Sequence, residues 1–262
     1  MSSDMPWETI RVEKRGAVDW LTLDRPDALN AMNARMITEL AEYFAERVTD
    51  TDTRVIVLRA NGRVFCAGLD LKEMSGLIDD LDTAARLRFQ QRLGRLIVSM
   101  RRCPQPIVCL VQGSASGGGF ALALASDIRY CTPDARMNAA FIKVGLTGCD
   151  VGMSYLLPRA VGTSVATEML MTGAFLDADR AARLGFVSGI VAPAELASVG
   201  ETVADSLLQA DPLGLALTKQ GLQVGIDAPS LDAAIANEDR QQALLSGADG
   251  FRTRIRAFLA RK

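Results

Sequence analysis

The chain of 262 residues contains no histidine. This absence excludes Ser-His-Asp and Cys-His nucleophilic sites, together with every metal site that depends on imidazole ligands. Any side chain that transfers a proton must therefore be an Asp, Glu, Lys, Tyr or Cys. The absence of histidine alone therefore restricts the acid–base chemistry of the protein to these five residue types.

The sequence also lacks an excess of positive charge. Its 29 Lys and Arg residues are balanced by 31 Asp and Glu residues, which gives a net charge of −2. Because nucleic-acid binding normally requires a basic excess that neutralises phosphates, we expect no nucleic-acid partner. The glycines at residues 117–119 lack the Gly-Lys-Ser/Thr ending of a phosphate-binding P-loop, so no nucleotide triphosphate is expected either.

Paired cysteines and long apolar runs are missing as well. The five cysteines form no Cys-x-x-Cys pair, and no cysteine or carboxylate cluster has metal-ligand spacing, so we expect reduced thiols and no metal. No segment reaches ~18 uninterrupted apolar residues, and residues 1–8 lack the features of a signal peptide. We therefore expect a cytoplasmic protein without a membrane partner. Hydrophobic residues make up 49% of the chain, which is ample for a sizeable core.

Strand and helix patterns alternate along most of the chain. Strands are predicted at residues 9–13, 18–23, 55–58, 107–111 and 128–131, and helices at 32–48, 83–100 and 120–125. This alternation predicts an α/β fold. After residue 193 the pattern is nearly all helical, with long helices expected at 196–210 and 230–245.

The most informative segment is residues 112–122, Gln-Gly-Ser-Ala-Ser-Gly-Gly-Gly-Phe-Ala-Leu, where an apolar strand meets three glycines and then a helix. Such a junction brings main-chain N–H groups to a helix N-terminus, where a ligand oxygen can approach them closely. Residues 64–74, which follow another apolar strand and lead into another helix, form a second junction of small residues. Together the two junctions indicate a two-donor oxyanion hole.

These two motifs, with Leu-Asp-Arg-Pro-Asp-Ala-Leu-Asn-Ala at residues 23–31, closely resemble the crotonase superfamily of enoyl-CoA hydratases and isomerases. Further motifs at 104–108, 126–129, 171–173 and 181–187 follow in family order. The resemblance implies a spiral of repeated strand-strand-helix units at residues 1–194, followed by a helical C-terminal trimerisation region at 195–262. It also implies an acyl-CoA substrate, a role in fatty acid metabolism, assembly into a trimer or a dimer of trimers, and no cofactor apart from the coenzyme A of the substrate.

Matched residue by residue, the resemblance assigns the oxyanion N–H groups to Leu69 and Gly118. It implies coenzyme A contacts at Arg25, Ala28, Ala67, Asp70, Lys72, Gly117, Phe258 and Arg261. Several of these positions have a purely structural alternative. Asp70 is also a suitable helix N-cap, Lys72 is also an ordinary charge on a helix surface, and the last residues are also compatible with a solvated C-terminus.

The acid–base residues are where the chain departs from the family pattern. The two glutamates that the hydratases use correspond here to Ala121 and Phe141, neither of which can carry a proton. The best remaining carboxylate is Asp150, whose Asp-Val-Gly context is similar to a loop of the dienoyl-CoA isomerases. Asp150 is alternatively a cap of the helix that begins near Gly152. Cys149 and Tyr155 are further candidate proton donors, and Ser114 and Ser116 are candidates to orient a water.

The leading hypothesis is an acyl-CoA enzyme that stabilises a thioester enolate with the Leu69 and Gly118 N–H groups and moves protons with Asp150. Its reaction would be enoyl-CoA hydration or isomerisation. Two alternatives remain open at this point: an acyl-CoA binding protein without catalytic activity, and a C–C bond or thioester hydrolase that activates water with Asp150.

Overall fold

The computed structural model describes residues 7–73, 75 and 82–260. Its main sheet has six strands in the order β1-β2-β3-β4-β6-β9, and β1 and β2 form an antiparallel hairpin while the other neighbours are parallel. The strands are β1 (Ile10–Arg15), β2 (Val18–Leu23), β3 (Val55–Ala60), β4 (Ile107–Val111), β6 (Ile128–Cys131) and β9 (Gly189–Ile190). The expected α/β fold is confirmed.

A second sheet of three short strands stands beside the first. It comprises β5 (Ser114–Ser116), β7 (Arg136–Asn138) and β8 (Leu176–Asp177), in the order β5-β7-β8. The chain passes from β4 in the main sheet to β5 in the second sheet and then into α4 (Gly118–Ala125). This passage is the strand-strand-helix unit that the resemblance implies. The next pair, β6 and β7, again crosses from the main sheet to the second sheet, and the 3₁₀ helix Ala140–Val144 follows it.

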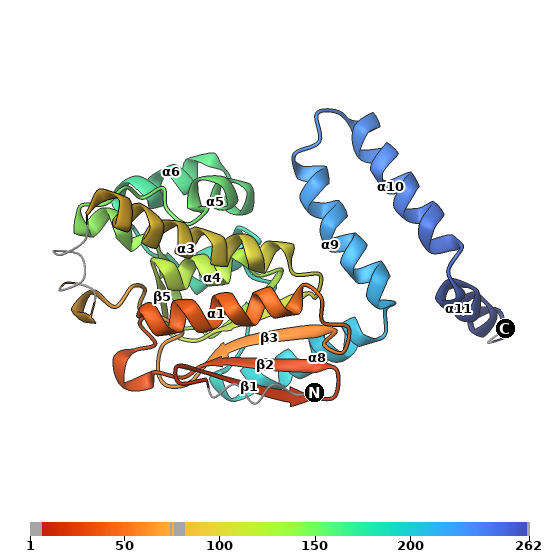
Figure 1. Cartoon of the computed structure of the whole chain (residues 1–262), viewed down its shortest axis with the longest axis horizontal. Helices are drawn as coiled ribbons and strands as arrows, with labels where there is room; N and C mark the ends of the chain where they lie inside the picture. Colours follow the sequence, from red (N-terminus) through yellow and green to blue (C-terminus); the bar gives the residue numbers. More distant parts are fainter. Residues whose placement is uncertain (1–6, 74, 76–81, 261–262) are drawn as a thin grey trace.

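The main sheet buries both of its faces because successive side chains of a strand point to opposite sides. On β3, Ile56 and Leu58 face the larger core, whereas Val55 and Val57 face a smaller one. The larger core lies beneath α1 (Ala34–Arg47), α3 (Thr83–Arg102) and α4, and α8 (Leu196–Leu208) covers the other face (Figure 1). Two shorter helices, α5 (Met153–Val161) and α6 (Thr163–Thr172), pack against each other near α3 and α4, and α7 (Ala178–Arg183) follows β8.

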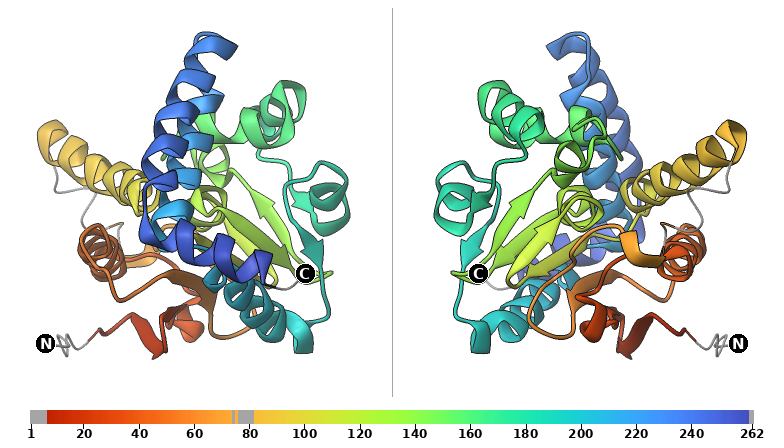
Figure 2. Two further views of the ribbon diagram at one scale, coloured as in Figure 1. Left: turned by 90° about the vertical axis from the view of Figure 1, so that its right-hand side faces the viewer. Right: turned by 90° about the vertical axis from the view of Figure 1, so that its left-hand side faces the viewer.

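The remaining helices extend away from the sheet. α9 (Pro212–Ile226) and α10 (Leu231–Ser246) form an antiparallel pair, and α11 (Asp249–Leu259) follows at the far end (Figures 1 and 2). The buried ammonium of Lys219 ties α9 to the core, because its Nζ lies 2.8 Å from Oδ2 of Asp127 and 2.9 Å from the carbonyl oxygen of Gln105. The expected helical region after residue 194 thus begins with a helix, α8, that packs on the sheet.

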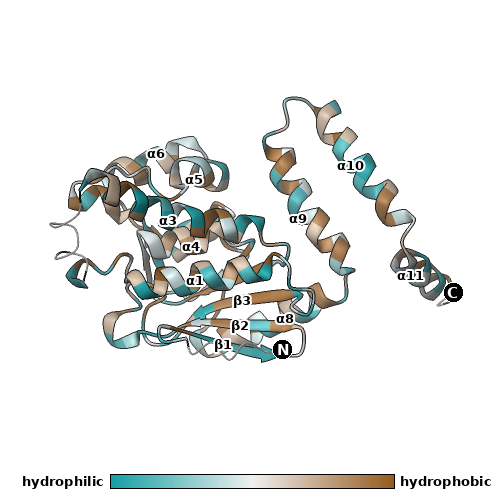
Figure 3. Ribbon diagram, viewed as in Figure 1, coloured by the Kyte–Doolittle hydropathy of each residue, from teal (hydrophilic) through white to brown (hydrophobic). Residues whose placement is uncertain are grey.

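Large apolar side chains remain exposed on these last helices. They are Leu213, Leu222, Val224, Ile226, Leu231, Ile235, Leu244, Phe251, Ile255, Phe258 and Leu259. Figure 3 marks hydrophobic residues along the ribbons of these helices. Even so, none of the helices in the described ranges is both long and apolar enough to cross a membrane.

Candidate functional site

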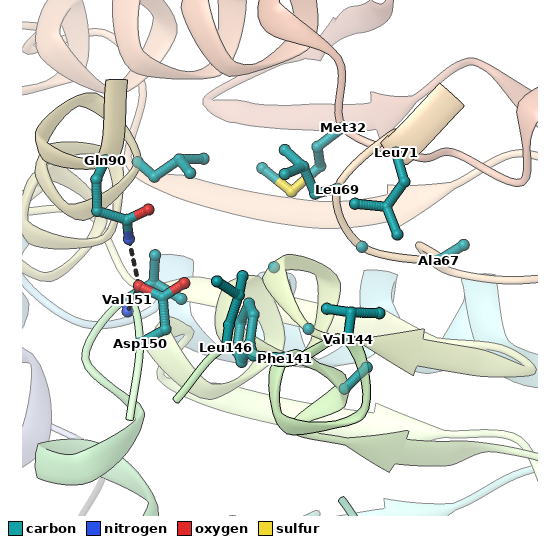
Figure 4. A pocket seen from close by; sticks show the side chains of 15 residues that line it. Met32, Ala67, Leu69, Leu71, Gln90, Phe141, Val144, Leu146, Asp150 and Val151 are labelled. Carbon is teal, nitrogen blue, oxygen red and sulfur yellow. Dashed lines mark hydrogen bonds between the residues drawn. The ribbon is translucent and has the colours of Figure 1, made fainter. Parts of the chain in front are cut away.

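A cavity of about 110 Å³ lies where the two glycine-containing junctions meet α3 and the loop before α5. Its walls are mostly apolar, and Figure 4 shows side chains from these segments converging on one space. The lining residues are Met32, Ala67, Gly68, Leu69, Leu71, Gln90, Leu93, Gly117, Gly118, Ala140, Phe141, Val144, Leu146, Asp150 and Val151.

The two predicted oxyanion residues both line this cavity. Met32 pairs with the segment around Leu69 through two main-chain hydrogen bonds: its N–H donates to the carbonyl of Gly68 (2.7 Å), and its carbonyl accepts from the N–H of Asp70 (3.0 Å). The main-chain N–H of Leu69, which lies between Gly68 and Asp70, therefore points away from Met32. Gly118 is the first residue of α4, where an N–H has no acceptor within the helix. Neither N–H has a protein acceptor within the described residues, so both remain available to a ligand oxygen.

Main-chain pairing brings the two junctions together. Cys66 N–H donates to the carbonyl of Ser114 (3.1 Å), and Ser116 N–H donates to the carbonyl of Cys66 (2.9 Å). This close approach requires glycine at position 119, since a Cβ there would lie 2.5 Å from the carbonyl oxygen of Cys66. The triple glycine therefore sets the distance between the strand-like segment before Leu69 and the start of α4.

Asp150 lies in the loop before α5 and reaches the same cavity. Its Oδ1 accepts hydrogen bonds from the main-chain N–H of Val151 (2.7 Å) and from Nε2 of Gln90 on α3. The other oxygen, Oδ2, has no hydrogen-bond partner within the described residues and points toward Leu146 (Figure 4). Burial raises the pKa of the Asp150 carboxyl, and the two N–H donors oppose that effect without cancelling it.

The alternative structural role of Asp150 is wrong. α5 has Gly152 at its N-cap and no side-chain cap hydrogen bond. The carboxylate of Asp150 is instead held by its own neighbour and by α3. Val151 adopts a φ of 41°, which is rare for a β-branched residue, and its N–H donates to the carboxylate.

The two positions at which the resemblance expects glutamates differ in environment. Ala121 is buried within α4 and does not line the cavity. Phe141 does line it and packs against Gly117, where an added Cβ would lie 3.4 Å from the ring. Asp150 is therefore the only titratable side chain among the described residues that line the cavity.

The other two predicted proton donors and the two serines predicted to orient a water do not line the cavity. Tyr155 is exposed on α5 beneath the guanidinium of Arg159, and Cys149 is exposed. The hydroxyl of Ser114 accepts from Nε of Arg136 (2.9 Å), and Ser116 belongs to β5.

Among the predicted coenzyme A contacts, Ala67 and Gly117 line the cavity. Asp70 and Arg25 lie beside it as an ion pair, with Nη1 of Arg25 2.9 Å from Oδ2 of Asp70. Oδ1 of Asp70 also accepts from the N–H of Glu73 (3.2 Å), so its alternative role as a helix N-cap is confirmed.

Three further predicted contacts, Lys72, Ala28 and Phe258, do not line the cavity. Lys72 is exposed next to Leu71 of the lining, and half-buried Ala28 ends the 3₁₀ turn Pro26–Ala28. Phe258 is exposed on α11, at the far end of the C-terminal helices (Figure 1). Arg261 lies outside the described residues.

Sequence reasoning missed Gln90, Met32 and the apolar pair Val144 and Leu146. Gln90 precedes the buried stripe of α3 and looks from sequence like any exposed helical glutamine. Its partner Asp150 is 60 positions away, so no local pattern signals the contact. Within the described residues there is no group of three or more Cys, Asp or Glu side chains that could hold a metal ion.

Comparisons with known proteins find relatives that match most of the chain. A model of a family described as enoyl-CoA hydratase/isomerase matches residues 13–262. A "probable enoyl-CoA hydratase" of Mycobacterium bovis is 38% identical over 86% of this chain and 80% of its own length. The 1,2-epoxyphenylacetyl-CoA isomerase of Escherichia coli is 33% identical over 92% of both chains. A crystal structure of a candidate enoyl-CoA hydratase from Streptomyces coelicolor A3(2) covers 100% of this chain and 95% of that chain, with a TM-score of 0.95 at 35% identity.

Proposed function

Because the chain belongs to the enoyl-CoA hydratase/isomerase family and is an acyl-CoA enzyme, we propose that it isomerises an enoyl-CoA by moving one proton, with Asp150 as both base and acid. The observation that carries this proposal is the makeup of the cavity. Asp150 is the one titratable group among its described lining residues, and it lies in the same cavity as Leu69 and Gly118. A double-bond shift needs one group that removes a proton from one carbon and returns it to another.

The oxyanion hole supplies the other half of the reaction. When the proton leaves the substrate, negative charge moves onto the thioester oxygen, and the N–H groups of Leu69 and Gly118 stabilise that charge. Loss of one such donor typically costs ~3 kcal/mol of transition-state stabilisation. The helix dipole at the start of α4 favours the same charge.

The apolar wall favours isomerisation over hydration. Addition of water needs a group that activates the water as well as a group that protonates carbon. Phe141, Val144 and Leu146 offer no hydrogen-bonding side chain for that water. Asp150 has its Oδ1 occupied by two donors, which leaves Oδ2 for the substrate proton.

For the coenzyme A part of the substrate we propose contacts at Ala67 and Gly117, with Lys72 and Ala28 nearer the phosphates and adenine. Arg25 and Asp70 support this region by bracing the loop that carries Leu69. Contacts from Phe258 and Arg261 would come from a neighbouring subunit. No separate cofactor is part of the proposal.

The proposal includes a cytoplasmic homotrimer or dimer of trimers. The exposed apolar side chains of α9, α10 and α11 support assembly, because exposed apolar groups gathered on one part of a protein typically mark an interaction surface. Sedimentation equilibrium of the purified chain tests this part, and a monomer would contradict it.

The central test incubates the purified protein with trans-2- and 3-enoyl-CoA substrates and identifies the products. We expect interconversion of the two double-bond isomers. Asp150→Asn should lower kcat by ~10²–10⁴-fold, because a positioned acid or base contributes about that much. The matched control is Asp179→Asn, an exposed aspartate outside the cavity.

Each alternative predicts a different product. A 3-hydroxyacyl-CoA would show hydration, free coenzyme A or a cleaved C–C bond would show hydrolysis, and tight binding without turnover would show a binding protein. Unchanged turnover in Asp150→Asn would reject the role of Asp150.

A further inference from the structure

We propose that Gln90 is a positioning residue that, with the main-chain N–H of Val151, ties down Oδ1 of Asp150 and so assigns proton transfer to Oδ2. This inference rests on the proposed function, because it concerns the carboxylate that carries the proton. It adds a residue of α3 to the proposed acid–base site, whose carboxylate lies in the loop before α5. Its basis is the hydrogen bonding around one carboxyl group.

The geometry separates the two oxygens of Asp150. Nε2 of Gln90 and the N–H of Val151 both donate to Oδ1, whereas Oδ2 points toward the cavity without a partner among the described residues (Figure 4). Both donors lie on one oxygen and come from separate segments, α3 and the loop before α5. The carboxyl plane therefore cannot rotate without losing both hydrogen bonds.

This arrangement serves both protonation states. An ionised Asp150 accepts two N–H donors at Oδ1 and can take a proton from the substrate at Oδ2. Once Oδ2 is protonated, Oδ1 remains a carbonyl-type acceptor and keeps the same two donors. Protonation at Oδ1 would instead displace one of them. The proton consequently resides on the oxygen that faces the substrate, in the base step and in the return step alike.

The charges around the cavity make the hydrogen bond from Gln90 important for the pKa of Asp150. No charged side chain other than Asp150 lies among the described residues that line the cavity. The segments around the cavity carry other charged residues, but these are engaged elsewhere or exposed. Lys72 is exposed, Lys143 lies over the ring of Phe175, and Arg159 pairs with Asp227. The arginines of α3 also lie outside the lining. With no cation at the carboxylate, the two N–H donors are what opposes the effect of burial on the Asp150 pKa.

The test replaces Gln90 by Leu, which removes the donor, and by Glu, which keeps the size and reach of the side chain but removes the amide. The control is Gln91→Leu, the exposed neighbour on α3 that does not line the cavity. Isomerase kcat and KM are measured against pH. Separately, the titration of Asp150 is followed by ¹³C NMR of the side-chain carboxyl, with Asp150→Asn as the assignment control. This second readout requires no turnover.

We expect both Gln90 variants to lower kcat about tenfold, with little change in KM, since the substrate keeps its other contacts. The acid limb of the kcat profile and the carboxyl titration should both move to higher pH. In both variants a donor to the ionised form is gone, and in Gln90→Glu a second carboxylate also repels it. Gln91→Leu should match the wild type. A loss caused only by altered packing would appear in the Leu variant and not in the Glu variant.

The outcomes separate this inference from the proposed function. If the carboxyl titration and the pH profile are unchanged in Gln90→Leu, which adds no charge, the inference is overturned, whatever Asp150→Asn does. If Asp150→Asn retains full turnover while the Gln90 variants still move the titration, the proposed function fails and only the hydrogen-bonding claim survives.

Discussion

Nη1 of Arg25 lies 2.9 Å from Oδ2 of Asp70, and the two side chains are only 15% and 10% exposed. The same guanidinium also donates to the carbonyl oxygen of Ala31 and to Glu73. Asp70 directly follows Leu69, so this ion pair fixes the loop that presents one of the two proposed oxyanion donors. The sequence motif that contains Arg25 thus has a structural role beside any contact with coenzyme A.

Replacing Arg25 by Met should destabilise the fold by about 1–3 kcal/mol, because it leaves Asp70 buried without its cation. Burial alone would raise the pKa of Asp70, but hydrogen bonds from Arg25 and from the Glu73 N–H outweigh it and hold that pKa below its usual range. The stabilisation is thus present above the unfolded-state pKa of ~3.9 and is lost as pH falls through the folded-state pKa. The difference between wild type and variant should therefore shrink on acidification.

Urea unfolding of both proteins at pH 7 and near pH 3 measures this difference, because the lower pH lies below the unfolded-state pKa of ~3.9. The control is Arg11→Met, which breaks an ion pair with Asp24 in which the arginine side chain is 70% exposed. That change should alter stability by about 0.5 kcal/mol or less. An equally large effect of Arg25→Met at both pH values would contradict the assigned role of Asp70.

The oxyanion role of Gly118 can be tested with a pair of substitutions that differ in one donor. Proline is tolerated at the first position of a helix, so Gly118→Pro removes the N–H while α4 can still form. Gly118→Ala keeps the N–H. In either variant the added Cβ would lie 2.9 Å from Sδ of Met32, so the two variants share this contact, and proline adds its ring carbons.

We expect kcat of Gly118→Pro to fall ~10²–10³-fold below that of Gly118→Ala, because the ratio isolates one hydrogen bond to the developing charge. Steady-state kinetics give the ratio, and circular dichroism checks that both variants fold alike. Equal kcat values in two folded variants would remove Gly118 from the oxyanion hole.

Much of the fold could be predicted from the sequence because its core strands have clear periodicity. The strand predicted at residues 107–111 coincides with β4, and the one at 128–131 coincides with β6. The helix predicted at 83–100 extends to Arg102 as α3. The two glycine-containing junctions that meet at the cavity could also be predicted, since glycine-rich strand-to-helix turns carry a local signal.

The parts that escaped prediction depend on contacts between distant residues. Strands β5, β7 and β8 have two or three residues each, too few to show alternation. Nothing local marks Val151 for a positive φ, a conformation that valine disfavours. The hydrogen bond from Gln90 to Asp150 depends on how α3 packs beside the loop, so only tertiary structure reveals that part of the proposed acid–base site.

The loop that carries Asp150 is itself fixed by a close main-chain contact. At Gly148 an added Cβ would lie 2.0 Å from the carbonyl oxygen of Leu170 on α6, so Gly148→Ala must displace the loop or the helix. We expect a loss of about 1–3 kcal/mol in stability, as for other overpacked sites. Because Asp150 is two residues away, kcat should fall as well.

For Gly94→Ala on α3 we expect the opposite change in stability from that of Gly148→Ala. Gly94 lies inside α3, and nothing lies within 4 Å of an added Cβ. Alanine there should raise stability by about 0.5–1 kcal/mol through its higher helix propensity, without changing kcat. Thermal unfolding and isomerase kinetics are measured on both variants. They compare Gly148, where a close contact requires glycine, with Gly94, where no contact does. If Gly148→Ala matched the wild type in both measurements, contact with α6 would not be what holds Asp150 at the cavity, and Gln90 and Val151 alone would have to position it.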